Sequence, residues 1–208
     1  MNRWASSRSE SHPNIFIHRN TLPMASYKIL GICGSLRKKS YNRSALLAAA
    51  EVMPENMQLT IANYDAVPLY NQDVQDQGIP AAVSQLAEQI RASDALLIAS
   101  PEYNFSISGV LKNAIDWMTR VPVQPFADKP VALLSATGGP VGGARHQYEV
   151  RKILGSQDAL VLTRPEIFIG ACHTKFDPSG KLVDEATRKI LADQMLAFER
   201  WIERLKRV

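Results

Sequence analysis

The fold of this 208-residue chain is indicated first by residues 27–43, which read YKILGICGSLRKKSYNR. Residues 27–33 form a short, mostly apolar run, a pattern typical of a strand buried on both faces of a sheet. The run breaks at Gly34 into a turn rich in hydroxyl and basic side chains. Residues 44–53 are rich in alanine and leucine and stop at Pro54, as expected of a helix. Strand, polar turn and helix in this order predict the start of a βαβ unit.

The rest of the chain repeats this alternation of short apolar runs and amphipathic segments. We expect further strands at residues 57–62, 95–99 and 131–134 and in a last strand region made of 160–162 and 167–169. We expect further helices opened by Pro80 and by Gly109, one over about residues 144–154, and a long one from Val183 to Leu205. Because crossovers between parallel strands are right-handed, the helices cover both faces. Five strands and five helices predict an α/β fold with a doubly wound parallel sheet.

Composition indicates one soluble globular domain. Hydrophobic residues make up 46% and charged residues 21% of the chain, close to globular averages, which excludes a disordered chain, a collagen-like repeat and a disulfide scaffold. The longest apolar runs, such as residues 95–99, are too short to cross a bilayer, so we expect no membrane span. Residues 1–25 are rich in serine and arginine and show no sustained period. We expect a disordered N-terminal extension there and a single domain over residues 26–208; Glu10 and Pro13 argue against a transit peptide.

The net charge limits the kind of partner, and the two cysteines limit the cell compartment and the kind of site. Lys and Arg number 24 against 20 Asp and Glu, a net charge of +4 that is spread along the chain. This favours anionic small molecules over nucleic acid as partners. Cys33 and Cys172 show no CxxC spacing, and the four histidines share no metal-ligand spacing with them. We therefore expect no metal site and a reducing, cytoplasmic location.

Ligands of such sheets bind beyond the carboxyl ends of the strands, so the loops that leave the strands matter most. The first exit loop, residues 34–43, combines hydroxyls and bases: Ser35, Ser40 and Asn42 can donate hydrogen bonds, and Arg37 supplies charge. At a helix start these groups suit a phosphate. The loop matches neither GxxxxGK[ST] nor GxGxxG. The alternative is a capped helix start with exposed bases, and the loop alone does not decide between them.

Two further exit loops carry unusual residues. In the second exit loop, residues 100–109, Pro101 stiffens a polar and aromatic stretch whose backbone could face the edge of a heterocycle. Alternatively, Tyr103 and Phe105 simply pack between neighbouring elements. The third exit loop, residues 135–143, holds four glycines within six positions, which lets backbone approach a flat ligand closely. Its alternative is a mobile surface loop.

These loops resemble a known family. Gly34-Ser35-Leu36-Arg37 with Ser40 and Asn42, Pro-Glu-Tyr-Asn at residues 101–104 and Leu-Lys-Asn-Ala-Ile-Asp-Trp at residues 111–117 are similar to motifs of the NADPH-dependent FMN reductase family. Within it the chain looks most like bacterial quinone and chromate reductases and azoreductases. The resemblance implies a flavodoxin-like fold with strand order 2-1-3-4-5, one FMN per subunit, and a homodimer or homotetramer.

The resemblance also implies site residues. Those expected to bind the cofactor are Ser35, Leu36, Arg37, Lys38, Lys39, Ser40, Tyr41 and Asn42 in the first exit loop, Pro101, Glu102, Tyr103, Asn104 and Phe105 in the second, and Ser135, Thr137 and Gly138 in the third. Ser35, Arg37, Ser40 and Asn42 would hold the FMN phosphate, and the second loop would line the isoalloxazine. Lys39 stands where small residues are frequent in relatives, and Thr137-Gly138-Gly139 also departs from the usual third loop.

The implied activity is oxidoreduction. NADPH or NADH would pass hydride to FMN, and FMN would pass two electrons to a quinone or a similar acceptor (an azo compound, chromate, a nitroaromatic or free flavin) in a ping-pong mechanism. No side chain is expected to act as a catalytic acid or base. The alternative is a flavodoxin-type electron carrier without nicotinamide turnover, which the basic net charge and Arg37 disfavour.

Overall fold

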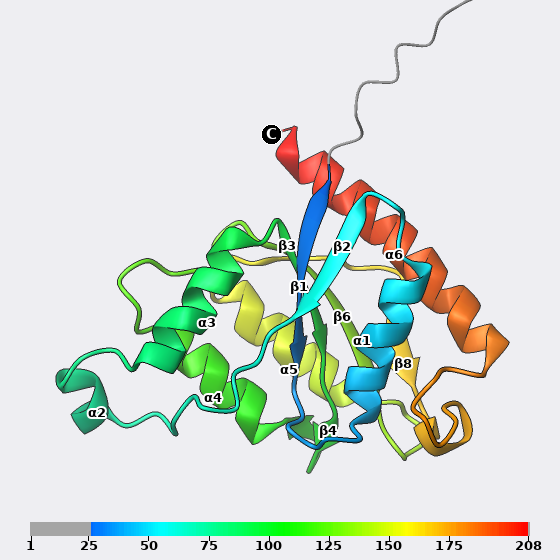
Figure 1. Cartoon of the computed structure of the whole chain (residues 1–208), viewed down its shortest axis with the longest axis horizontal. Coiled ribbons are helices and arrows are strands. Elements are labelled where there is room, and N and C mark those ends of the chain that lie inside the picture. The colour runs from blue at the N-terminus through cyan, green and yellow to red at the C-terminus, as the bar shows by residue number, and fades with distance from the viewer. Residues whose placement is uncertain (1–25, 208) are drawn as a thin grey trace, which may run out of the picture.

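The computed structural model describes residues 26–207 and contains a parallel sheet between two layers of helices (Figure 1). The expected extension over residues 1–25 lies outside the described part. The sheet contains β1 (Tyr27–Cys33), β2 (Met57–Ile61), β3 (Ala95–Ala99), β6 (Pro130–Ala136), β7 (Leu160–Val161) and β8 (Ile167–Ile169). Its order is β2-β1-β3-β6-β7, and β8 also pairs with β6. The expected flavodoxin-like, doubly wound fold is confirmed, with six strands instead of five.

The sixth strand arises because the last strand position is divided. β7 pairs with Pro130 and Val131 at the start of β6, whereas β8 pairs with residues 134–136 at its end. Pro165, which has no N–H to donate, lies in the intervening segment. There the amide of Gln194 donates to the carbonyl oxygens of Leu133 and Pro165, at 2.9 Å each. A side chain from the last helix thus takes the place of ladder hydrogen bonds.

Five helices cover the two faces of the sheet (Figure 1). α1 (Tyr41–Val52) and α6 (Glu185–Lys206) share one hydrophobic core, while α3 (Ala81–Ala92), α4 (Gly109–Met118) and α5 (Ala144–Gly155) share the other. α1 begins three residues earlier than its alanine-rich stretch indicates, because the Ser40 hydroxyl caps it by accepting from the backbone N–H of Arg43. This cap brings the first exit loop to the helix start. No helix within residues 26–207 is long and apolar enough to span a bilayer.

Shorter elements near the carboxyl ends of the strands were not expected from the sequence. They are α2 (Gln72–Asp76), the hairpin of β4 (Glu102–Tyr103) and β5 (Ser106–Ile107), and the 3₁₀ turn η1 (Cys172–Thr174). The hairpin turns at Asn104 and Phe105, whose φ angles of 49° and 68° are both positive, as a tight two-residue hairpin requires. Strands of two residues are too short to show an alternating pattern.

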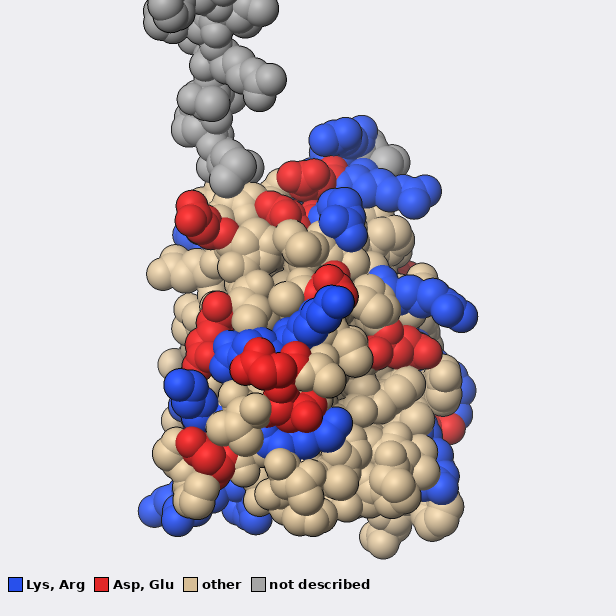
Figure 2. All heavy atoms as spheres, turned by 90° about the vertical axis from the view of Figure 1, so that its right-hand side faces the viewer, with Lys and Arg blue, Asp and Glu red and all other residues tan. Residues whose placement is uncertain are grey.

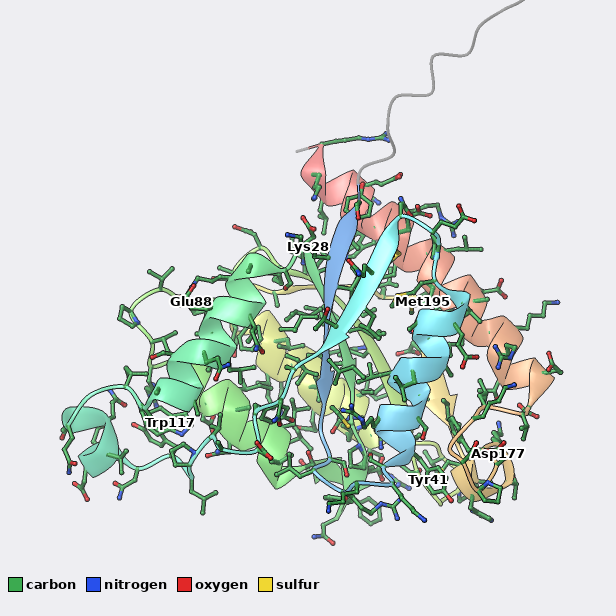
Figure 3. The ribbon with its side chains drawn as sticks, viewed as in Figure 1. Lys28, Tyr41, Glu88, Trp117, Asp177 and Met195 are labelled. Carbon is green, nitrogen blue, oxygen red and sulfur yellow. The ribbon has the colours of Figure 1, made fainter. Side chains whose placement is uncertain are left out.

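The stretch 111–117 has a structural role that explains two of its residues. Asn113 Nδ2 and Trp117 Nε1 both donate to the carbonyl oxygen of Pro68, each at 2.8 Å, and Asn113 Oδ1 accepts from the backbone N–H of Tyr70 at 2.8 Å. Trp117 is fully buried on α4 (labelled in Figure 3). α4 therefore holds the loop that follows β2.

Candidate active site

A cleft of about 330 Å³ opens at the carboxyl ends of β1, β3 and β6, within the size range of small-molecule sites. All three exit loops contribute to it. It is lined by Ser35, Arg37, Ser40, Tyr41, Asn42, Pro101, Glu102, Tyr103, Ala136, Thr137, Gly138, Cys172 and His173. Figure 3 labels Tyr41, at the start of α1, on the side of the molecule where the strands end. The structure therefore brings together the three segments singled out in the sequence.

Direct hydrogen bonds join the first and second exit loops. The backbone N–H of Gly34 donates to the carbonyl oxygen of Ala99 at 2.7 Å, and the Ser108 hydroxyl donates to the Gly34 carbonyl oxygen at 2.7 Å. A Cβ atom on Gly34 would lie 2.5 Å from the Cβ of Ser100, closer than two carbon atoms can approach without displacement. Glycine is therefore required at this position for the loops to meet.

A single buried side chain joins the first and third exit loops. Asn42 Nδ2 donates to the carbonyl oxygen of Ala136 at 2.9 Å, and Asn42 Oδ1 accepts from the Ala136 backbone N–H at 2.9 Å. The side-chain amide therefore acts as both donor and acceptor. Asn42 was expected to offer a donor to a phosphate, but its amide instead holds the third exit loop in place.

One corner of the cleft carries positive charge and hydroxyls. Ser35, Arg37 and Ser40 line it, and the Arg37 guanidinium lies 5.3 Å from the centre of the Tyr41 ring. The first turn of α1 contains no acidic residue, so the positive end of the helix dipole is not neutralised there. This corner suits an anionic group such as a phosphate.

The other side of the cleft is a slot between the β4–β5 hairpin and the third exit loop. A Cβ placed on Gly138 would meet nothing within 4 Å, so the missing side chain leaves this wall of the slot open. Pro101 and Tyr103 line the cleft together with Thr137 and Gly138. A planar group can enter between walls of this kind.

Glu102 ties the hairpin to α5. Its Oε1 accepts from Arg145 Nη1 at 2.7 Å, and its Oε2 accepts from the backbone N–H groups of Arg145 and His146 at 3.2 and 3.4 Å. Burial by itself would raise the pKa of Glu102, but these hydrogen bonds and the Arg145 charge lower it on balance. The Arg145 guanidinium also lies 4.2 Å from the centre of the Phe105 ring. The carboxylate is thus neutralised within the protein and leaves the cleft with a net positive charge.

Ten of the sixteen residues expected to bind a cofactor line the cleft, and six do not. Leu36, Lys38 and Lys39 point to neighbouring hollows, and Asn104 and Phe105 form the exposed tip of the hairpin. Ser135 is fully buried: its hydroxyl donates to the carbonyl oxygen of Gly142 at 2.6 Å and accepts from Gln147 Nε2 at 2.8 Å. β6 continues through Ala136, so Ser135 belongs to the sheet. Its hydroxyl holds the third exit loop through the carbonyl oxygen of Gly142.

Ala136, Cys172 and His173 line the cleft without having been expected there. The backbone N–H of Thr137 donates to Ile169 and that of Cys172 donates to Thr137, both at 3.0 Å to the carbonyl oxygen. These bonds fold the segment after β8 against the third exit loop. No local pattern in the sequence signals a contact between segments 35 residues apart.

Both cysteines are free, and both are buried. Burial raises the pKa of the Cys33 thiol and of the Cys172 thiol, which keeps them protonated and poorly nucleophilic near neutral pH. The expected structural role of Cys33 agrees with this environment. Burial likewise lowers the pKa of His146, whose Nδ1 lies 2.8 Å from the Gly143 carbonyl oxygen.

Comparison with known proteins agrees with this architecture. Residues 27–174 match the model of a family described as NADPH-dependent FMN reductase. A Pseudomonas aeruginosa protein named NAD(P)H-dependent FMN reductase is 48% identical over 179 residues, covering 86% of this chain and 97% of the relative. The quinone reductase of Escherichia coli K12 is 42% identical over 182 residues, with coverage of 86% and 97%.

A solved structure supports the same relationship. The flavoenzyme NAD(P)H:(acceptor) oxidoreductase FerB from Paracoccus denitrificans superimposes with a TM-score of 0.78 at 31% sequence identity, covering 86% of this chain and 98% of that one. The family model spans residues 27–174 and therefore includes all three exit loops in full. The chain belongs to the NADPH-dependent FMN reductase family.

Proposed function

We propose that this protein is an FMN-dependent NAD(P)H oxidoreductase that reduces quinones. The observation that carries the proposal is the cleft itself: a hydroxyl-rich, positively charged corner at the start of α1 opens into a slot between two loop walls. A phosphate suits the corner and a flat heterocycle suits the slot, which are the two ends of FMN. When bound, FMN accepts a hydride from NAD(P)H and returns two electrons to an acceptor.

In this scheme the residues of the chain bind FMN and orient it. Ser35, Arg37 and Ser40 would hold the phosphate, with the α1 backbone behind them. Pro101, Tyr103 and the backbone of the hairpin would line one side of the ring system, and Thr137 and Gly138 the other. Asn42 and Glu102 would keep the two walls at a fixed separation through their hydrogen bonds. Fixed walls favour catalysis because hydride transfer needs the reacting atoms within about 3–3.5 Å.

Reductant and acceptor would use the same open side of the slot in turn, which predicts ping-pong kinetics. The exposed wall at Gly138 supports access for ligands of varied shape, so we expect activity with quinones first, and also with azo compounds, chromate, nitroaromatics or free flavin. We assign no proton-transfer role to any side chain; both thiols and His146 are buried.

We further infer that residues 26–208 act as one domain in a cytoplasmic homodimer or homotetramer. Exposed apolar side chains near the hairpin and the third exit loop, Tyr103, Phe105 and Val141, support an interface there. The two free cysteines support a reducing compartment.

The visible absorption spectrum of purified protein tests the proposal. Protein supplied with FMN is expected to be yellow, to bleach with anaerobic NADPH, and to recover its colour when a benzoquinone is added. A yellow protein that neither NADPH nor NADH bleaches would instead be a flavodoxin-type carrier. A colourless protein that takes up no FMN contradicts the assignment of the cleft.

A further inference from the structure

A second hollow lies beside the cleft and is strongly basic. It has a volume of about 320 Å³ and is bounded by Arg37, Lys38, Lys39 and Arg43 on one side and by residues 177–180 on the other. We call it the basic hollow. Arg37, Ser40 and Tyr41 line both the basic hollow and the cleft, so the two spaces adjoin. Figure 3 labels Tyr41 and Asp177 on its two sides, and Figure 2 shows Lys and Arg side chains along the lower edge of the face that carries α1 and α6.

The charges of the basic hollow are not balanced. Nine ion pairs lie within residues 26–207, and none of them involves the four cationic side chains of the hollow. Asp177 is the one carboxylate in its lining. That carboxylate accepts from the Ser179 N–H, the Ser179 hydroxyl and the Lys181 N–H at 2.9, 2.6 and 3.0 Å. The Asp177 carboxylate is therefore engaged by hydrogen bonds within its own turn. Because four cations face one carboxylate, the hollow carries a net positive charge.

The walls of the basic hollow are held in place by packing. Gly180 has a φ of +89°, and a Cβ there would lie 2.8 Å from the Ser44 hydroxyl, so the turn sits directly against α1. The rings of Tyr41 and Phe176 lie 5.7 Å apart and connect the base of the turn to the start of the helix. Two hydroxyls, of Ser44 and Ser179, add hydrogen-bonding groups to the lining. A firm wall with bases and hydroxyls is suited to a phosphate group.

We propose that the basic hollow binds the 2′-phosphate of NADPH, with Lys39 and Arg43 as its main contacts, and so makes this enzyme prefer NADPH to NADH. The inference rests on the proposed function, because it extends the nicotinamide site of that cleft. The two dinucleotides differ only in this phosphate, which carries a charge of about −1.5 to −2 at neutral pH.

Kinetics of single and double variants test the assignment. Lys39→Gln and Arg43→Gln are each expected to raise KM for NADPH roughly tenfold, as the loss of one charge-assisted hydrogen bond predicts. Neither variant should change KM for NADH, kcat, or the dissociation constant of FMN. Lys181→Gln is the matched control, because this exposed lysine follows the 177–180 turn but does not line the hollow. It should leave all four quantities unchanged.

A binding measurement makes the test independent of turnover. Isothermal titration of FMN-loaded protein should show that adenosine 2′,5′-bisphosphate binds more tightly than AMP, and that Lys39→Gln removes the difference. Equal losses with NADPH and NADH, or no loss with either, would overturn the proposal. Weaker FMN binding in the variants would also overturn it, because the hollow would then serve the FMN phosphate. If the wild type oxidises neither dinucleotide, the proposed function fails, and the bisphosphate titration still decides whether the hollow binds this phosphate.

Discussion

Replacement of Glu102 by alanine should loosen the hairpin that lines the cleft. The change removes two hydrogen bonds that cap α5 through the backbone N–H groups of Arg145 and His146, and one ion pair with the Arg145 side chain. Loss of a helix cap costs about 0.5–2 kcal/mol, and loss of an ion pair that is exposed only on its Arg145 side about 0.2–1 kcal/mol. We therefore expect Glu102→Ala to lower the free energy of unfolding by about 2 kcal/mol. Glu102→Gln keeps one oxygen acceptor and should cost about half as much.

The effect of Glu102 should depend on pH in a defined direction. Its pKa is lower in the folded protein than in the unfolded chain. Its contribution is therefore complete above the unfolded-state pKa of about 4.3 and is lost as the pH falls through the folded-state value. The difference between wild type and Glu102→Ala should be constant around pH 7 and should shrink below about pH 4.

Urea unfolding of the FMN-free protein at pH 7 and at low pH measures both effects. Glu149→Ala is the control, because Glu149 also lies on α5 and pairs with Lys152 at 2.8 Å, but in an exposed position. It should change the free energy of unfolding by less than about 0.5 kcal/mol. The reasoning is refuted if Glu102→Ala behaves like this control, or if the difference from wild type persists unchanged at low pH.

Three further substitutions test the contacts that join the exit loops and the positively charged corner of the cleft. Asn42→Ala leaves the N–H and C=O of Ala136 without partners and should lower the free energy of unfolding by about 2–5 kcal/mol; a loss below 1 kcal/mol in urea would show that water replaces the amide. Gly34→Ala forces a Cβ to within 2.5 Å of the Ser100 Cβ and should cost about 1–3 kcal/mol. Adding Ser100→Gly should recover part of that loss, and simple additivity in this double-mutant cycle would contradict the clash. Arg37→Ala should weaken FMN binding roughly tenfold in a fluorescence titration, with little effect on unfolding; unchanged affinity would remove Arg37 from the phosphate corner.

The sheet and its helices could be predicted because their signals are local. β1, β3 and β6 are mostly apolar and, apart from the exposed Lys28 in β1, buried, and each helix shows an apolar stripe on one side. The division of the last strand into β7 and β8 could not be predicted in the same way. Leu162 still donates its N–H to Val131 of β6, and beyond it Gln194 of the last helix donates to the carbonyl oxygens of Leu133 and Pro165, contacts that no local pattern signals.

The same distinction holds for the cleft. The composition of the three exit loops indicated an anion and a planar ligand, because glycines, hydroxyls and bases at strand ends have that chemistry wherever they fold. The sequence could not indicate that the Glu102 carboxylate would cap α5, nor that Cys172 and His173 would enter the lining. Both outcomes depend on contacts between segments that are distant along the chain.

By itself, the sequence determined the fold class, the family motifs and the edge of the sheet where the candidate cleft opens, since hydrophobic period and the composition of the strand-exit loops depend on neighbouring residues. The tertiary structure alone decided which of those residues face the cleft and which hold it together. Asn42 and Ala136 are 94 positions apart, and Glu102 and Arg145 are 43 apart. A side chain commits its hydrogen bonds to whichever buried backbone groups lack partners, and those groups become neighbours only when the sheet has assembled.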